Sequence, residues 1–323
     1  MLQDIIRFSL FGHEIAIHGF GLMLVIGFLC AMQLAKFLAR KSGLDGEVFA
    51  NACLLGLFTG VLGARLSHVL ENLSDFTRSD RSIGQNLFEM INISSGGLTY
   101  YGGFLLAFPT LLIYAAKKKI PLRLGMDIIA PCLMVGLAFG RVGCFLNGCC
   151  YGAESNLPWS VEFPYGSYAY EDEYRNGEVT PPSALTYSTD DGGRAIYPPL
   201  QIKKSGNATL EQMASQQHSR PVHPSQLYTT ITALLLAAML VAYYSLPHTP
   251  GSVFAMMMVL EGIGRFVLEL LRVEPPVLYV HGYGFSLSMV LGVALAIGGG
   301  ILGFIFNRMG GSTHPSMAKL ATA

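Results

Sequence analysis

The sequence predicts an all-α membrane protein with about seven transmembrane helices, and three observations support this class. Hydrophobic residues make up 51% of the 323 residues and charged residues only 13%, which is about half the charged fraction of an ordinary soluble domain. The mean hydropathy is +0.45, and the apolar residues form stretches of the roughly 20 residues that a helix needs to cross a bilayer. Glycine is abundant, with 37 residues, which suits the close packing of helices in lipid.

Seven apolar stretches are long enough to span a membrane. They cover residues 15–38, 48–70, 97–116, 125–147, 224–246, 252–272 and 283–306. Basic residues in the short connections predict the orientation, because cytoplasmic loops carry an excess of Lys and Arg. The connections on one side carry Arg40, Lys41, Lys117, Lys118, Lys119, Arg123, Arg308 and Lys319, and those on the other side carry Arg7, Arg78, Arg81 and Arg272. This asymmetry predicts the N-terminus outside and the C-terminus in the cytoplasm.

One polar segment, residues 148–222, interrupts the apolar pattern between the fourth and fifth stretches. We expect residues 1–323 to form a single polytopic membrane domain in which this segment is a long extracytoplasmic insertion. It is longer than an ordinary connection between helices. A lid or docking surface and an excursion without chemistry are equally consistent with its sequence.

Four charged residues lie inside predicted spanning helices: Arg65, Arg141, Arg265 and Glu269. An arginine at the centre of a helix costs about 2.5–3.5 kcal/mol on insertion scales, so such residues usually face a polar cavity. Arg265 and Glu269 are four residues apart and share a helix face. A guanidinium stays charged and binds phosphate through two parallel donors, which favours an anionic lipid headgroup as the ligand. Structural ion pairs are the alternative, and it is weakest for Arg141.

Histidine and tyrosine supply candidate proton acceptors. His18 is expected early in the first helix, His68 lies one turn after Arg65, and His223 precedes the fifth helix. Each could act as a base near neutral pH, although a lone histidine more often satisfies a structural hydrogen bond. Tyr101, at the start of the third helix, could donate a hydrogen bond to a ligand.

Other function classes have less support. The neutral net charge gives no reason to expect nucleic-acid binding. Cys144, Cys149 and Cys150 would suit a redox or metal protein, but their spacing lacks the paired Cys or His of zinc motifs. A transporter for an anionic solute would also need intramembrane arginines, but paired broken helices in two matching halves are not evident.

Taken together, the motifs resemble the bacterial prolipoprotein diacylglyceryl transferases. The similarity covers most of the chain, and the motifs occur in the family's order. They are His18-Gly-Phe-Gly-Leu-Met23, Gly63-Ala-Arg65, Gly96-Gly-Leu-Thr-Tyr-Tyr-Gly-Gly103, Gly140-Arg-Val-Gly-Cys-Phe-Leu-Asn-Gly148 with Gly152, His223-Pro-Ser-Gln-Leu-Tyr228 and Arg265-Phe-Val-Leu-Glu-Leu-Leu-Arg272.

The resemblance implies a reaction in the bacterial plasma (inner) membrane. A diacylglyceryl group would move from phosphatidylglycerol to the lipobox cysteine in the signal peptide of a prolipoprotein, with release of glycerol 1-phosphate. The resemblance implies neither a metal nor an organic cofactor. The resemblance implies that Arg141 binds phosphatidylglycerol and that Arg265 is a second central arginine. We expect the catalytic residues to be Arg265, Tyr101, His18 and Glu269. We expect the substrate-binding residues to be Arg141, Arg65, Asn147, Gly152, His223, Ser225 and Gln226.

The chain departs from the family pattern at several positions. Tyr101 stands where some members have a candidate base histidine, and Phe20 replaces a tyrosine. Cys144 and Cys149 replace an asparagine and a glutamate, and Phe285 replaces a glutamine. These departures leave the base open among Tyr101, His18 and His68.

Overall fold

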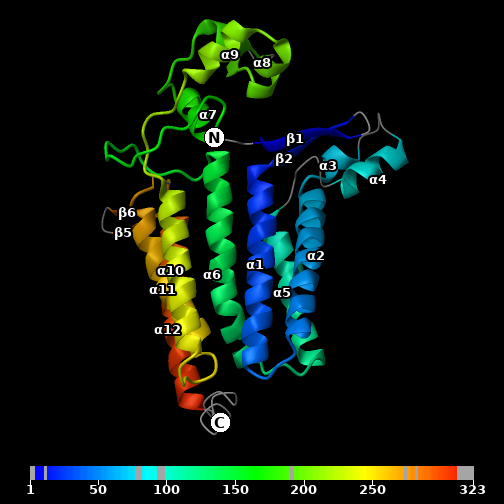
Figure 1. Cartoon of the computed structure of the whole chain (residues 1–323), viewed down its shortest axis with the longest axis vertical. Coiled ribbons are helices and arrows are strands. Elements are labelled where there is room, and N and C mark those ends of the chain that lie inside the picture. Colours follow the sequence, from blue (N-terminus) through cyan, green and yellow to red (C-terminus); the bar gives the residue numbers. More distant parts are fainter. Residues whose placement is uncertain are drawn as a thin grey trace. The chain divides into compact units, whose positions relative to one another are not determined.

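The computed structural model describes residues 4–10, 13–77, 82–92, 99–189, 193–272, 275–280 and 283–310, and these are mostly helical (Figure 1). The chain divides into two compact units. The first consists of the segments up to Ala31, from Ala130 to Leu246 and from Ser252 to Gly310. The second contains the described residues of Met32–Ile129 and Pro247–Gly251.

Each of the seven predicted stretches overlaps a long helix. These helices are α1 Gly19–Lys41, α2 Gly46–Glu71, α5 Tyr100–Lys117, α6 Leu122–Asn147, α10 Ser225–Tyr244, α11 Ser252–Glu269 and α12 Leu287–Met309. Five of them (α1, α2, α6, α10 and α12) are long and apolar enough to cross a membrane. In these five, between 17% and 39% of the most apolar 18-residue window is buried, so most of their apolar surface is available to lipid.

The remaining two helices fall short for different reasons. The apolar part of α5 covers only Tyr101–Lys117. Helix α11 has 18 residues, and three of them are charged: Glu261, Arg265 and Glu269. The structure therefore confirms a mostly helical membrane protein with five candidate spans, and the number seven stays a prediction.

Strands at two helix ends correct the all-α prediction. The first is a hairpin of β1 Asp4–Leu10 and β2 His13–His18, and the second is a hairpin of β5 Pro276–Val280 and β6 Tyr283–Ser286. The predicted helices from residues 15 and 283 thus begin later, at Gly19 and Leu287. Ile15 and Ile17 alternate with other residues at the two-residue period of a strand, a signal that the long apolar run obscured.

Helices α11 and α12 of the first unit pack closely through glycine. A Cβ atom added to Gly262 would lie 2.5 Å from the carbonyl oxygen of Gly292, and one added to Gly292 would lie 2.9 Å from the carbonyl oxygen of Gly262. Larger residues at these positions would separate the two helices. This contact brings the charged residues of α11 next to the first turn of α12.

The polar segment 148–222 has cores of its own. Its elements are α7 Tyr168–Arg175, η1 Ser183–Leu185, β3 Thr186–Ser188, β4 Arg194–Ile196, α8 Pro199–Ser205 and α9 Ala208–Ser215. One apolar cluster gathers around Tyr170 and Leu185, and a second contains Phe163 and Val222. The Phe163 ring lies 5.9 Å from that of Phe145 near the end of α6. The segment is therefore a folded layer anchored on the end of a candidate spanning helix.

A buried carboxyl in this layer predicts a pH-dependent stability. Burial raises the pKa of Glu173, although the backbone N–H of Arg220 donates to its carboxylate at 2.9 Å. Because the folded-state pKa is raised, the stabilisation is complete below the ordinary value of 4.5 and is lost as the pH rises through the raised pKa. We expect hydrogen exchange in α7, corrected for intrinsic rates, to accelerate between acidic and neutral pH.

Glu173→Gln should abolish this dependence, because a neutral amide oxygen can still accept from Arg220. The matched control is Glu211→Gln on the exposed face of α9. This variant should keep the pH dependence of hydrogen exchange in α7. Protection that increases with pH in the unmodified protein would contradict the assignment to Glu173.

Candidate functional site

A buried carboxylate organises two arginines at the end of α11. Glu269 is 3% exposed, and its Oε2 lies 3.9 Å from Nη2 of Arg265 and 3.5 Å from Nη1 of Arg272. The predicted pairing of Arg265 with Glu269 on one helix face is therefore present. Arg272, a residue of the predicted outer connections, belongs to the same cluster.

The first turn of α12 completes this cluster with two hydroxyl groups. Ser286 Oγ donates to Glu269 Oε1 at 3.1 Å and accepts from the backbone N–H of Met289 at 3.2 Å, which caps the helix. Arg265 Nη2 donates to Ser288 Oγ at 2.8 Å. The carboxylate thus has two cations and a hydroxyl donor as partners, so the Arg265 side chain is held in one orientation.

Glu261 joins Arg141 to this cluster. Its carboxyl interacts electrostatically with both Arg265 and Arg141, so the two guanidinium groups approach a common region from α11 and α6. Glu261 was not among the predicted site residues. The signal was available in its position four residues before Arg265, on the same helix face.

The end of α6 is held by residues of the His223-to-Tyr228 motif. Ser225 Oγ donates to the carbonyl oxygen of Cys150 at 2.8 Å, and Gln226 Nε2 donates to that of Cys149 at 2.7 Å. Both side chains are buried, at 2% and 0% exposure. The Asn147 side chain interacts with the Cys149 thiol. Ser225 and Gln226 therefore shape the site by positioning backbone.

Gly152 and His223 pack together beside this turn. The Gly152 N–H donates to the carbonyl oxygen of His223 at 2.9 Å, and a Cβ atom at Gly152 would lie 2.7 Å from the His223 Cβ. The His223 Nδ1 lies 3.3 Å from the hydroxyl of Tyr228, which accepts from Trp159 Nε1 at 2.7 Å. Gly152 thus permits a close approach of two chain segments.

The structure places His18 differently from the prediction. It is the last residue of β2, not a residue of α1, and its side chain is exposed. Phe20, two residues later, packs on α6, where a Cβ atom at Gly143 would meet its ring at 3.0 Å. His18 therefore lies close in sequence to the contact between α1 and the glycine-rich part of α6.

Arg65 belongs to the second unit and is engaged with backbone there. It is 5% exposed. Its Nε donates to the carbonyl oxygen of Met90 at 3.0 Å and its Nη2 to that of Glu89 at 2.6 Å. These carbonyls end α4 Ile83–Ile91, and the guanidinium also lies 5.2 Å from the ring centroid of Phe76 in α3 Leu73–Phe76. The contacts favour a structural role for Arg65.

The other predicted residues of the second unit surround the same helix ends. The His68 ring packs edge-on against Phe76 with centroids 6.0 Å apart. Tyr101, in the first turn of α5, is 67% exposed. The motif that precedes it begins at Gly96 and Gly97, which lie outside the described residues.

We expect Arg65→Ala to lower stability and to leave the apparent KM for lipid unchanged. The substitution removes both side-chain donors to the α4 carbonyls, and a buried acceptor left without a partner costs about 1–3 kcal/mol. Thermal unfolding in detergent and lipid titration of the activity would measure the two effects. Arg40→Ala, at the exposed end of α1, is the matched control. A raised KM at unchanged stability would instead assign Arg65 to substrate binding.

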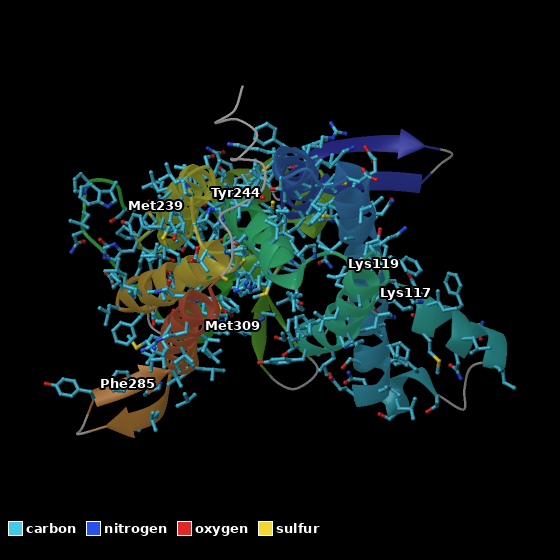
Figure 2. All side chains as sticks on the ribbon, turned by 90° about the horizontal axis from the view of Figure 1, so that it is seen from below. Lys117, Lys119, Met239, Tyr244, Phe285 and Met309 are labelled. Carbon is cyan, nitrogen blue, oxygen red and sulfur yellow. The ribbon has the colours of Figure 1, made fainter. Side chains whose placement is uncertain are left out.

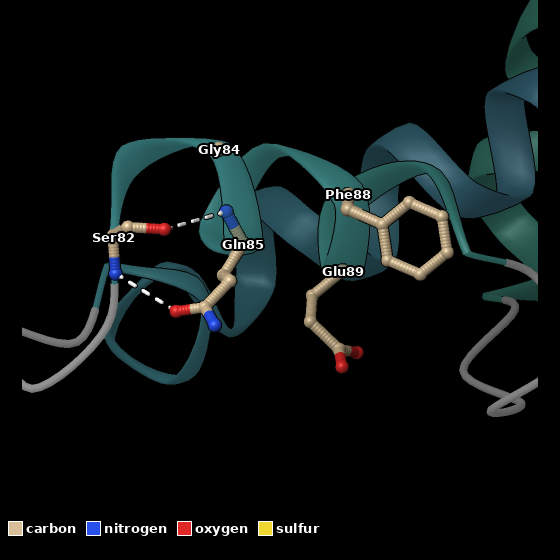
Figure 3. A pocket seen from close by; sticks show the side chains of 5 residues that line it. All are labelled: Ser82, Gly84, Gln85, Phe88 and Glu89. Carbon is tan, nitrogen blue, oxygen red and sulfur yellow. Dashed lines mark hydrogen bonds between the residues drawn. The ribbon is translucent and has the colours of Figure 1, made fainter.

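Each unit has a hollow among its described residues, at α4 in the second unit and on α11 and α12 in the first. One of about 440 Å³ follows the capped first turns of α4, where Ser82 and Gln85 exchange hydrogen bonds (Figure 3). Among the residues that the structure describes, the charged side chain that lines it is Glu89. The other, of about 220 Å³, lies on α11 and α12 and is lined by Gly262, Ile263, Phe266, Val293, Ala296 and Ile297. This purely apolar groove suits a hydrocarbon chain.

Comparison with known proteins identifies the family. The family model described as prolipoprotein diacylglyceryl transferase matches residues 6–305. A phosphatidylglycerol–prolipoprotein diacylglyceryl transferase of Rhodopirellula baltica is 36% identical over 51% of this chain, and the match spans 33% of that relative's length. Proteins of the same name from Clostridium tetani and Corynebacterium diphtheriae are 25% and 26% identical, over 84% and 88% of this chain and 86% and 87% of their own lengths. Because the family model covers nearly all of its residues, the chain belongs to the prolipoprotein diacylglyceryl transferase family.

Proposed function

We propose that this chain transfers the sn-1,2-diacylglyceryl group of phosphatidylglycerol to the lipobox cysteine of a prolipoprotein. A thioether forms, and glycerol 1-phosphate leaves. This is the first step of lipoprotein maturation, and family membership supports it. The structural observation that supports it most directly is the cluster of Arg141, Arg265 and Arg272 around the carboxyl groups of Glu261 and Glu269. Three guanidinium groups facing two carboxyl groups leave a positive surplus for a phosphodiester.

Arg141 is the proposed headgroup ligand. Within the part of the chain that the structure describes, no hydrogen bond or ion pair to another residue occupies its guanidinium. Arg265 is held by Glu269 and Ser288, so it is preorganised to stabilise the charge that develops on the departing phosphate. Arg65, which the sequence predicted to bind substrate, is proposed to act structurally instead, because its guanidinium donates to the carbonyl oxygens of Met90 and Glu89.

The apolar groove on α11 and α12 supports the proposed donor. Gly262 and Phe266 line it and flank Arg265 in sequence, and the Phe266 ring centroid lies 6.4 Å from that of Phe285. Phe285 lies in β6, next to the start of α12 (Figure 2). An acyl chain in this groove would place its headgroup toward the arginine cluster.

The proposed setting is the bacterial plasma (inner) membrane. With α5 and α11 included, seven spans would put the N-terminus outside and the C-terminus in the cytoplasm. Lys117 and Lys119, at the C-terminal end of α5 (Figure 2), support a cytoplasmic position for that end. Segment 148–222 would then face the outside, where lipobox peptides arrive. Tyr101, His18 and His68 stay candidates for the group that takes the thiol proton.

A reconstituted transfer assay tests this function. Purified protein in nanodiscs is mixed with phosphatidylglycerol and a lipobox peptide, and mass spectrometry seeks the diacylglyceryl thioether. The matched controls are a Cys→Ser peptide and nanodiscs of phosphatidylcholine alone, and neither should give product. The absence of product from folded protein with both substrates would overturn the proposal, and solute uptake would then have to be measured.

A further inference from the structure

Three cysteines near the end of α6 converge in space. Four residues separate Cys144 from Cys149, and Cys149 and Cys150 are adjacent in the sequence. The sulfur atoms of Cys144, Cys149 and Cys150 all lie within 4.8 Å of one another, and each residue is partly buried. Cys144 belongs to the last turn of α6, and the other two follow its end at Asn147. The spacing alone did not predict a metal site, because the convergence depends on the turn that ends the helix.

The backbone of this turn reverses through two left-handed residues. Gly148 has φ +71° and Cys150 has φ +60°. The second value is uncommon for a residue with a side chain and costs about 1–2 kcal/mol, and such strain concentrates at functional sites. The reversal brings Cys149 back over the helix, where its N–H donates to the carbonyl oxygen of Cys144 at 3.1 Å.

Buried partners hold the strained turn in place. The carbonyl oxygens of Cys149 and Cys150 accept hydrogen bonds from Gln226 and Ser225 of α10. With both carbonyls fixed, the two thiols are directed toward Cys144 before any ligand binds. Preorganisation of this kind is what a metal site requires of its ligands.

The distances and charges suit a thiophilic divalent cation. Zinc–sulfur bonds of about 2.3 Å in a tetrahedron put sulfur atoms roughly 3.8 Å apart. The three sulfur atoms here lie within 4.8 Å of one another, so each sulfur–sulfur distance would have to shorten by about 1 Å or less for zinc to bind. Three thiolates around one Zn²⁺ carry a net charge of −1. Arg141 and Arg272 both act electrostatically on Cys150 and would compensate this charge.

We propose that Cys144, Cys149 and Cys150 bind Zn²⁺ and that its fourth, open position takes the thiol of the prolipoprotein substrate. This inference rests on the proposed transfer reaction. Three protein ligands with an open fourth position are the pattern of catalytic zinc sites, whereas structural sites have four. The same electrostatic contact of Arg141 places the site beside the proposed headgroup ligand.

The ion would supply the reactive form of the nucleophile. A thiol that coordinates zinc gives up its proton, which passes to water. The sulfur lone pair then forms the bond to the glycerol carbon, and the bond between that carbon and the phosphate oxygen breaks. The electron pair leaves with glycerol 1-phosphate, and the neutral thioether is a weaker ligand that dissociates.

Cobalt substitution of the full-length protein tests the site without relying on turnover. Co²⁺ in place of Zn²⁺ should bind at one ion per chain with a thiolate charge-transfer band. A lipobox peptide should shift the cobalt spectrum, and its Cys→Ser analogue should not. The joint variant Cys144→Ser, Cys149→Ser and Cys150→Ser should lose the ion, and Cys30→Ser and Cys53→Ser should retain it.

Measurement of turnover is a second test of the zinc site. Chelation of zinc from the unmodified protein should lower thioether formation by about 100-fold or more, the scale of an activated nucleophile, and added Zn²⁺ should restore it. This arm does not depend on whether the joint variant folds. Product formation by the metal-free protein at the unmodified rate would overturn the inference and leave the transfer function intact. A cobalt spectrum shifted by the peptide, without any thioether, would keep the site and overturn the function.

A cobalt spectrum that does not respond to the peptide would overturn the open fourth position, and failure of the reduced protein to bind one Co²⁺ per chain would overturn the zinc site.

Discussion

Glu269→Gln is expected to lower turnover by roughly 100-fold or more, since loss of one preorganised electrostatic contact has this scale. The carboxylate holds Arg265 and Arg272 within 4 Å and accepts from Ser286. A neutral amide keeps the shape but leaves two poorly solvated guanidinium groups without their counter-charge. Removing one partner of a buried ion pair costs about 3–5 kcal/mol, so the thermal midpoint should also fall.

Glu171→Gln is the matched control for this prediction. Glu171 and Arg175 form another pair four residues apart, at 3.7 Å, but the arginine side chain is 73% exposed. Exposed pairs contribute about 1 kcal/mol or less, so this variant should be nearly normal. Glu269→Asp separates charge from geometry: it should recover kcat in part if Glu269 acts by positioning Arg265. Equal effects of Glu171→Gln and Glu269→Gln would contradict a special role for the buried carboxylate.

The sequence predicted the helical part of the fold because hydrophobic length is a local property. Seven apolar stretches correspond to seven helices, with boundaries within a few residues for α2, α6 and α10. The hairpin β1–β2 was missed because Ile15 and Ile17 are apolar in either conformation. The cores of segment 148–222 were missed because they join residues far apart in the chain, such as Phe163 and Val222.

The same distinction between local and long-range contacts applies to the site residues. The pairing of Arg265 and Glu269 follows from a spacing of four on one helix, so it could be predicted. The partners of Arg65 could not, since they are carbonyl groups of α4 some 25 residues away. Likewise, the role of Ser225 and Gln226 depends on the left-handed turn at Gly148 and Cys150, which composition and spacing do not reveal.

Arg141 should give the largest loss of lipid transfer among the arginines. Because its guanidinium is available to bind the phosphodiester through two parallel donors, we expect Arg141→Ala to lower kcat/KM for phosphatidylglycerol by roughly 100-fold to 1,000-fold. Arg141→Lys restores the charge without the two-pronged geometry, so it should recover activity only in part. Lipid titrations at saturating peptide would separate kcat from KM.

Arg308→Ala, at the end of α12 beyond the groove, is the matched control and should leave both constants unchanged. The central carbon of its guanidinium lies 5.2 Å from the centroid of the Phe304 ring, so its contact there is with an aromatic face. If Arg141 binds the headgroup, the lysine variant should also lose its preference for phosphatidylglycerol over other anionic lipids, because a point charge does not read the geometry of a phosphodiester. A loss that is uniform across lipids, together with a lower thermal midpoint, would instead make Arg141 a structural partner of Glu261.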